Sequence, residues 1–369
     1  MKAFFRPLCG IYVHWPYCLS KCPYCDFASR VCKNPDYDAL LKGYERDILI
    51  FKEKMPHPPL ITSLYFGGGT PSLMPILFFD SFMTLLQKNF SFAPDIEISL
   101  EANPDAVTQE KMRDFKQAGV NRLSIGVQAL NESDLRFLGR RHSLARALDC
   151  VHEAQNVFDN LNIDLIYARP NQTLSDWEKE LNKALSLNLP HYSLYQLTIE
   201  ENTVFGKKGV SSATEETAVA LYELTNELMR AHHVPDYEIS NYARAGFECR
   251  HNLTYWHYAD YLGLGPAAQG RIAGFETVNP RTPADWLAKG PTLTKLTPLE
   301  TAQERVIMGL RLKNSGFPCS QLAQSGIQKA CENGWGYVSD NLFYPTESGF
   351  LMLNQLILLV APDSIPLEQ

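Results

Sequence analysis

The chain has 369 residues, of which 45% are apolar and 20% charged, a composition typical of a globular protein with a large core. Its formal net charge of −7 argues against a broad nucleic-acid-binding face, because such a face needs an excess of basic residues. No apolar run approaches the ~20 residues of a transmembrane helix. We therefore expect no nucleic-acid partner and no membrane span.

The first 18 residues combine a short apolar stretch with Arg6 and His14, and no small-residue cleavage site follows them. This pattern predicts a first strand and not a signal peptide. We therefore expect a cytoplasmic protein, in which thiols stay reduced and clustered cysteines serve a metal or catalysis. The nine cysteines are an odd number, which also fits poorly with a disulfide framework.

From the N-terminus to about residue 200, strand-like runs alternate with amphipathic helices. We predict strands at 10–14, 61–66, 96–102, 122–127, 162–167 and 192–197, and helices at 36–54, 78–88, 108–118, 144–158 and 173–187. Strands separated by helices of this length form right-handed βαβ units and a parallel sheet. The pattern predicts an α/β fold, a partial (β/α)6 TIM-like barrel with its chemistry at the carboxyl ends of the strands.

The pattern changes after about residue 205. A helix at 215–232 and a strand at 237–239 precede a glycine-rich, loop-like stretch. A helix at 302–312 and the apolar run 350–360 predict a small, mainly helical C-terminal domain. We therefore divide the chain into a barrel with its extension at 1–279, a Pro- and Thr-rich linker at 280–299 and the C-terminal domain at 300–369.

Three cysteines, Cys18, Cys22 and Cys25, follow the first predicted strand at the spacing C-x3-C-x2-C. A zinc site normally takes four ligands, often in two pairs, and no second pair follows here. A conventional [4Fe–4S] cluster takes four cysteines, so three cysteines leave one iron open for a small molecule. The alternatives are a loop of unrelated thiols or a partial zinc site.

This spacing resembles the signature of the radical S-adenosylmethionine (SAM) superfamily. In that family the open iron chelates the amino and carboxylate groups of SAM, and reduction of the cluster gives a 5′-deoxyadenosyl radical. The segment "YFGGGTPS" at 65–72 ends the second predicted strand, where relatives bind the amino group of SAM. Glycine lets the backbone approach a ligand closely. On its own, the segment could be only a strand-to-helix turn.

Six further segments resemble one branch of that superfamily, the coproporphyrinogen-oxidase-like proteins typified by HemN and HemW. They are "YVHWPYC", "EANPD", "RLSIGVQ", "LGRRHS", "NIDLIY" and "YSLYQLTIE". The resemblance implies that Tyr12 and Tyr24 lie beside the cluster. It also implies that SAM is held by Gly68, Gly69, Thr70, Glu101, Gln128, Arg140 and Asp164.

The residue types at these positions suit such a ligand. Carboxylates can accept hydrogen bonds from ribose hydroxyls or an ammonium group, and Arg140 can meet a carboxylate in a fork. Glu101, Gln128 and Asp164 each belong to a predicted strand end, where a barrel places its site. The alternative is that they cap the helices that follow, and for Asp164 alone this would be the preferred interpretation.

Two activities compete within this branch. One is oxygen-independent oxidation of coproporphyrinogen III, in which the radical abstracts hydrogen from propionate side chains before decarboxylation. The other is delivery of haem to apoproteins by haem chaperones of the HemW type. Cys18 lies close to the start, and Phe27 stands where the oxidases carry a further cysteine. Both features favour the chaperone.

A HemW-type chaperone implies haem, SAM and a [4Fe–4S] cluster as cofactors, with haem-accepting apoproteins and a reductant protein as partners. A transient contact with a membrane surface would suit delivery to respiratory proteins, although nothing in the composition indicates it. A third interpretation, from another class, is a structural metal-binding scaffold without SAM chemistry.

The segment "HNLTYW" at 251–256 matches a pattern that HemW relatives carry and associate with haem binding. The resemblance implies that His251 ligates the haem iron and that Asn252, Tyr255 and Trp256 belong to the same site, the two aromatic rings covering the macrocycle. His257 is close enough to compete as the ligand. Without the resemblance, an aromatic segment packed on the core would be the preferred interpretation.

Two departures from the family pattern affect the expected site. "YARPNQT" replaces the more usual YGLPGQT, which introduces Arg169 into the loop after Asp164 and could alter access for SAM or porphyrin. Gln269 stands in "GLGPAAQG" where relatives often have a histidine, which removes one candidate ligand or proton donor.

Overall fold

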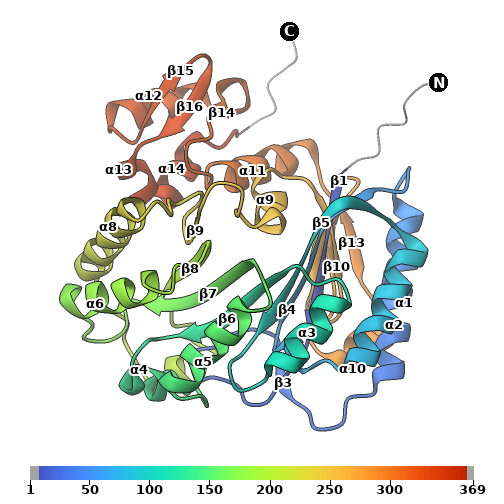
Figure 1. Ribbon diagram of the computed structural model, residues 1–369. Helices are drawn as coiled ribbons and strands as arrows, with labels where there is room; N and C mark the ends of the chain where they lie inside the picture. The colour runs from blue at the N-terminus through green and yellow to red at the C-terminus, as the bar shows by residue number, and fades with distance from the viewer. Residues whose placement is uncertain (1–7, 364–369) are drawn as a thin grey trace.

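The computed structural model describes residues 8–363, and a curved eleven-stranded sheet is its main feature (Figure 1). Seven neighbouring strands run parallel. In order across the sheet they are β10 (Asp260–Leu264), β1 (Leu8–Trp15), β4 (Leu60–Gly68), β5 (Ser91–Ala102), β6 (Arg122–Gln128), β7 (Asn160–Tyr167) and β8 (His191–Gln196). Six of them fall where the sequence predicts strands, so the partial (β/α)6 barrel is confirmed.

The sheet stays open, because different strands form its two edges. At one edge β9 (Asn241–Ala243) pairs antiparallel with β8. At the other edge, three antiparallel strands continue from β10. They are β11 (Gln269–Ile272), β12 (Phe275–Val278) and β13 (Thr292–Lys295).

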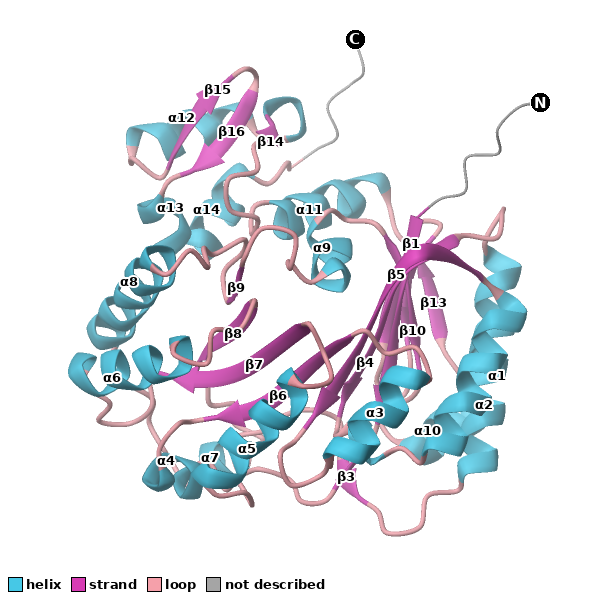
Figure 2. Cartoon of the chain, in the orientation of Figure 1, coloured by secondary structure: helices cyan, strands magenta, loops and turns pink. Residues whose placement is uncertain are grey.

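Helices cover the outer face of the sheet (Figure 2). They are α1 (Tyr37–Lys54), α2 (Ile76–Asn89), α3 (Gln109–Gln117), α5 (Leu144–Gln155), α6 (Leu174–Leu185) and α8 (Glu215–Ala231). Two short helices, α4 (Glu132–Phe137) and α7 (Val204–Lys207), pack on each other at the carboxyl ends of the strands (Figure 2). Side chains of Asp36, Thr108, Ser143 and Thr173 accept a backbone N–H in the first turn of α1, α3, α5 and α6. Each such cap stabilises its helix by about 1 kcal/mol, which explains why these helices begin where the sequence predicts.

The two faces of the sheet differ in chemistry. Residues that alternate along each strand point to opposite faces, so that Ile98, Leu100, Leu123 and Ile163 pack in the main hydrophobic core with the helices. The intervening residues are polar and bond one another across the inner face, as Ser124 and Asn162 do with Asp164. TIM-like barrels usually fill their interior with branched apolar side chains, so a polar interior indicates a site.

The region from residue 232 to 299 departs from prediction. The expected strand at 237–239 does not form, and Asp236 makes only an isolated bridge to Tyr242. The glycine-rich stretch contains α9 (Arg250–Trp256) and the strands β10 to β12. The expected linker contains α10 (Pro283–Lys289) and β13, and Trp286 is fully buried against α1, where its Nε1 donates to Asp47 at 2.7 Å.

The C-terminal part has its own core, built from Val306, Phe343 and Leu356 among others. Its helices are joined by a small antiparallel sheet that the sequence does not predict. The elements are α11 (Pro298–Gly309), β14 (Phe317–Pro318), α12 (Gln324–Glu332), β15 (Gly336–Ser339), β16 (Leu342–Pro345), α13 (Glu347–Leu351) and α14 (Leu353–Val360). Buried Lys313 ties this part to the barrel through Asp236, 3.2 Å away. No helix between residues 8 and 363 has the length and apolar character to span a bilayer.

Candidate functional site

One cleft opens at the carboxyl ends of the parallel strands and has a cavity volume of about 350 Å³. This volume falls within the ~300–1,000 Å³ of small-molecule sites. The cleft brings together every predicted cluster and SAM residue except Tyr12. They are Cys18, Cys22, Tyr24, Cys25, Gly68, Gly69, Thr70, Glu101, Gln128, Arg140 and Asp164.

Cys18 ends β2 (Tyr17–Cys18), and Cys22 and Cys25 lie on the loop that joins it to β3 (Arg30–Val31). All three are half-buried free thiols, and the Cys25 amide closes a turn on the carbonyl of Cys22 at 3.2 Å. Burial raises the pKa of the Cys25 thiol to about 11, and a bound metal would deprotonate it.

The arrangement of these thiols suits a cluster better than a single ion. Within residues 8–363, no three His, Cys, Asp or Glu side chains converge as the ligands of one metal ion do. The cysteines of a [4Fe–4S] cluster bind different irons, so they need only face one shared volume. Cys18, Cys22 and Cys25 meet that requirement, because all of them line the cleft.

The glycine segment that ends β4 is packed directly beneath the cysteine loop. The amide of Gly69 donates to Trp15 O at 2.7 Å, and a Cβ at Gly69 would stand 2.5 Å from Tyr17 O. Gly68 has a φ of +104°, and a Cβ there would meet the His14 ring at 2.6 Å. Glycine is therefore required here for the close approach of two chain segments, in addition to any role toward a ligand.

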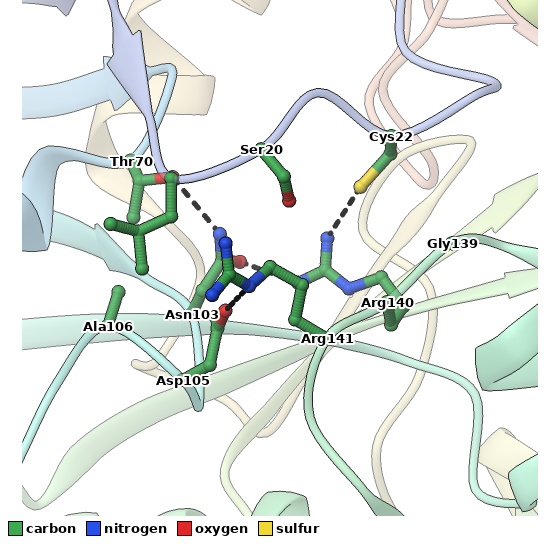
Figure 3. Close-up of a pocket in the computed structure, with 10 residues that line it drawn as sticks. Ser20, Cys22, Thr70, Asn103, Asp105, Ala106, Gly139, Arg140 and Arg141 are labelled. Carbon is green, nitrogen blue, oxygen red and sulfur yellow. Dashed lines mark hydrogen bonds and ion pairs between the residues drawn. The ribbon is translucent and has the colours of Figure 1, made fainter. Parts of the chain in front are cut away.

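Arg140 lies against the cysteine loop, and no carboxylate pairs with it within the described chain (Figure 3). Its Nη1 donates to Cys22 Sγ at 3.4 Å, and its Nη2 donates to Asn103 Oδ1 at 2.7 Å. The neighbouring Arg141 pairs with Asp105 at 3.4 Å. The predicted fork between Arg140 and a carboxylate is therefore not formed by protein groups.

Asn103 also donates to Thr70 Oγ1 at 3.1 Å, and so it links the glycine segment to Arg140 (Figure 3). The sequence analysis did not select it, although it belongs to the "EANPD" segment. Its position two residues after Glu101, on the same face of the chain, was the signal available.

Two carboxylates lie at the floor of the cleft. Glu101 accepts from the Tyr65 hydroxyl at 2.9 Å, and burial together with the charge of Asp164 raises the pKa of Glu101 to about 8. Asp164 accepts from Asn162 at 2.8 Å and from Ser124 at 3.2 Å, while burial raises its pKa. Both groups therefore favour a cationic or hydrogen-bond-donating ligand.

The helix-cap alternative for Asp164 is wrong. Asp164 lies in the middle of β7, and Thr173 caps the helix that follows. Gln128 does end its strand, β6, beside a shift in the pairing register, and its φ is +74°. A non-glycine residue in this conformation costs on the order of 1–3 kcal/mol and is often found where a side chain is directed at a site.

The two tyrosines predicted beside the cluster have different surroundings. Tyr24 lines the cleft and packs on Phe205. Tyr12 does not line it. Its hydroxyl lies 3.0 Å from His14 Nδ1, and its ring stacks on Tyr65 and His251 with centroids 6.4 Å apart in both pairs.

The segment "HNLTYW" forms α9, which packs on the inner face of β1, β4 and β10 and not in the cleft. His251 is only 1% exposed. Its Nδ1 lies 2.9 Å from Ser63 Oγ, and its Nε2 lies 2.7 Å from the Tyr255 hydroxyl. Burial lowers the pKa of His251 to about 3, so the ring is neutral.

As arranged here, neither nitrogen of His251 is free to bind a haem iron. The prediction that His251 ligates haem therefore requires that Ser63 and Tyr255 release the ring. Asn252 donates to the Tyr237 hydroxyl at 3.4 Å, and Trp256 lies under the guanidinium of Arg311 at 5.5 Å. These contacts match the alternative in which the segment packs on the core.

The remaining predicted residues lie outside the cleft. His257 follows α9 and is exposed. Arg169 is buried and pairs with Glu180 and, at 2.9 Å, with Asp134, so its expected effect on access to the cleft is not borne out by its position. Gln269 begins β11 and is exposed.

The comparisons with known proteins agree with this geometry. Residues 12–184 match the Radical SAM superfamily. The chain is 38% identical to the haem chaperone HemW of Haemophilus influenzae over 272 residues, which cover 72% of this chain and 71% of that protein. It is 33% identical to the haem chaperone HemW of Bacillus subtilis over 369 residues, which cover 94% of this chain and 97% of that protein.

Among solved structures, the coproporphyrinogen III oxidase HemN of Escherichia coli superposes with a TM-score of 0.82 at 21% identity. The superposition covers 96% of this chain and 90% of the oxidase. At this identity the likeness establishes a shared fold, and it extends through the C-terminal part.

Proposed function

The chain belongs to the HemW family of the radical SAM superfamily, and from this premise we propose that it is a haem chaperone that carries a [4Fe–4S] cluster, binds SAM and transfers haem to acceptor proteins. Membership of the superfamily implies the cluster and SAM. The inclusion of haem in the proposal follows from the likeness to haem chaperones. The observation that carries the proposal is that one cleft is lined by the three cysteines, the glycine segment and polar residues of the parallel strands.

In this proposal Cys18, Cys22 and Cys25 hold the cluster. A cluster with one open iron supplies a site that chelates SAM and an electron for its reduction. Arg140 donates a hydrogen bond to Cys22 Sγ, and such a bond to a ligating sulfur would tune the reduction potential of the cluster. The electron would come from a reductant protein, which is part of the proposal.

The rest of the cleft would bind and orient SAM. The backbone of Gly68 and Gly69 offers a surface without side chains, and Gln128 offers an amide. Glu101 and Asp164 can accept hydrogen bonds from ribose hydroxyls or the ammonium group. A bound cation beside Glu101 would favour the ionised carboxylate, whose pKa in the protein alone is about 8.

In this proposal haem binds at α9 or at His257, the residue that follows this helix. His251 can serve as the ligand only after its ring leaves Ser63 and Tyr255, whereas the His257 side chain is already exposed. The proposal therefore includes a rearrangement of α9 if His251 is the ligand.

The test is haem retention by anaerobically reconstituted protein. Haem is added, free haem is removed on a desalting column, and the Soret band is recorded for the wild type, His251→Ala and His257→Ala. We expect retention by the wild type and its loss in one of the two variants. Absence of retention by the wild type would refute the chaperone, and full retention by both variants would place the ligand elsewhere.

A second measurement separates the chaperone from the oxidase. Coproporphyrinogen III is incubated anaerobically with the reconstituted protein, SAM and a reductant, and the products are analysed by mass. The proposal expects no decarboxylation. Formation of protoporphyrinogen would refute the chaperone function and show that the protein is an oxidase.

A further inference from the structure

Tyr65 lies between the cleft and α9, and although it begins the segment "YFGGGTPS", neither the resemblance nor the comparisons give its side chain a role. It belongs to β4, two residues before the glycine segment, and its side chain lines the cleft. The same side chain contacts α9 on its other side. It therefore touches both regions that the family resemblance marks.

On the cleft side, Tyr65 fixes a carboxylate. Its hydroxyl donates to Glu101 Oε1 at 2.9 Å. One oxygen of Glu101 is thereby held, and the carboxylate cannot rotate freely. A hydrogen bond from a buried hydroxyl to a charged group contributes about 1.5–3 kcal/mol in proteins.

On the other side, Tyr65 is held by the ring of His251. The two rings stack with centroids 5.2 Å apart and an angle of 21° between their planes. Tyr12 stacks on Tyr65 as well, with centroids 6.4 Å apart and an angle of 24°. Stacked rings at such distances contribute about 0.5–1.5 kcal/mol beyond the burial of their area.

The sequence leaves room for this stack. At Gly10 on β1, a Cβ would stand 3.0 Å from Ser63 Oγ, 3.1 Å from Thr254 and 3.3 Å from His251 Nδ1. A side chain at position 10 would require Ser63, Thr254 and His251 to shift by a few tenths of an ångström, which would disturb the packing of His251 on Tyr65. Gly10 thus permits the contact that positions Tyr65.

We propose that Tyr65 is a positioning residue, which holds Glu101 in place for SAM and is itself held by the ring of His251. The inference rests on the proposed function, because it takes Glu101 to be a SAM contact. It makes the affinity for SAM depend on the position of α9. Linkage is reciprocal, so SAM would in turn oppose the release of His251.

The first test measures SAM binding by titration calorimetry of the reconstituted protein, with its cluster, between pH 6 and pH 9. Tyr65→Phe keeps the ring and removes the hydroxyl. We expect SAM to bind roughly 10-fold more weakly to Tyr65→Phe at pH 7, by the size of a hydrogen bond to a charged group. The matched control is Tyr242→Phe, which removes a buried hydroxyl that donates to Asn226 at 2.6 Å, outside the cleft.

The pH profile distinguishes positioning from general damage. The Tyr65 hydrogen bond lowers the pKa of Glu101, so its loss raises that pKa further and moves the rise in SAM affinity to higher pH. The other groups that act on Glu101 are Asp164, the backbone amide of Gly68, Arg122 and the hydroxyls of Tyr12, Tyr195 and Tyr255. They are unchanged in the variant. A folded Tyr65→Phe with wild-type affinity and pH profile would overturn the proposal.

The second test asks whether His251 acts through Tyr65. His251→Gln keeps a polar group at the position and removes the stacked ring, and we expect it to weaken SAM binding about 3-fold, by the size of one ring contact. In a Tyr65→Leu background the same change should have no further effect, which a double-mutant cycle detects. Additive effects, or no effect of His251→Gln, would overturn the proposal. A wild type that binds its cluster but no SAM would instead refute the proposed function together with this inference.

Discussion

The two ends of the inner face of the sheet carry side chains of the same kinds, but the surroundings of these side chains differ. At the carboxyl end, the half-buried Cys22 and Glu101 face a cleft, and Arg140 reaches across it. Toward the amino end, Glu97 accepts the backbone amides of Arg250 and His251 at 3.2 Å each. A cleft therefore marks one end, and mutual hydrogen bonding marks the other.

This difference teaches how a motif should be interpreted. "GGGTPS" and "HNLTYW" both identify the family, but only the first lies where a ligand can reach it. In the second, each polar group of His251 already has a protein partner. A family motif thus locates a segment of the fold, and the structure shows whether the side chains of that segment are available to a ligand.

The largest expected effect concerns the cysteines. Cys22→Ala should abolish the cluster, because the lining of the cleft within residues 8–363 contains just three thiols, those of Cys18, Cys22 and Cys25, and the change removes one of them. The iron content and the visible absorbance of the cluster would both fall to background. Cys249→Ala is the matched control at the opposite end, since burial there raises the pKa of the thiol to about 12.

If the two ends differ as described, Cys249→Ala keeps its iron. Loss of the cluster in that variant would show that the whole inner face acts as one unit. Retention of the cluster in Cys22→Ala would remove the cysteine loop from the proposed function.

The next effect concerns the two glutamates of β5. Glu101→Gln removes one of the two carboxylates that line the cleft and should weaken SAM binding about 10- to 100-fold, since one hydrogen bond to a charged group contributes about 1.5–3 kcal/mol. The part of the rise of affinity with pH that follows Glu101 should vanish, because the group whose pKa is about 8 is gone. Titration of the reconstituted protein with SAM at pH 7 and pH 9 measures both effects.

Glu97→Gln is the partner experiment at the amino end. It changes a residue of the same strand and the same face, but one that holds the backbone of α9. We expect unchanged SAM affinity within about 2-fold and a loss of stability of about 1–3 kcal/mol in denaturant titrations. The reverse pattern would mean that SAM contacts the amino end.

Much of the carboxyl end could be predicted from sequence. Polar residues at the ends of apolar strands, such as Glu101 and Gln128, follow from period-two alternation, and the parallel order brings the strand ends together. The cysteine spacing is a local feature of the sequence, so it can be recognised without knowledge of the fold. These features need few long-range contacts.

The amino end could not be predicted in the same way. The burial of His251 depends on Ser63, 188 positions earlier, and on the absence of a side chain at Gly10. The same holds for β10, which is short and contains Gly263, and for Trp286, whose pocket is formed by α1. Such features are fixed by tertiary packing that overrides local pattern.

A smaller effect concerns the support of α9. Ser63 is fully buried, and Ser63→Ala leaves His251 Nδ1 without its partner at 2.9 Å. We expect a loss of about 1–3 kcal/mol in the free energy of unfolding, together with faster uptake of haem if His251 is the ligand. The control, Ser81→Ala, removes an exposed hydroxyl on α2 and should change stability by less than about 0.5 kcal/mol. Equal losses in both variants would contradict the described role of Ser63.

The smallest expected effect is the pH dependence of stability that His251 contributes at the amino end of the inner face. Burial lowers the pKa of His251 to about 3, so the folded protein keeps this ring neutral while the unfolded chain protonates it below about pH 6.5. Stability from this group is therefore full above about pH 6.5 and is lost as pH falls toward 3, at up to about 1.4 kcal/mol per pH unit. His14, His142 and His191 are buried with lowered pKa values and contribute slopes of the same sign.

The difference between the wild type and His251→Gln isolates one histidine, because the other three are common to both. Denaturant unfolding at pH 5, 6 and 7 should show a shallower pH slope in the variant, by about one proton. An equal slope would mean that the ring of His251 takes up a proton in the folded protein, and hence that α9 already opens without a ligand.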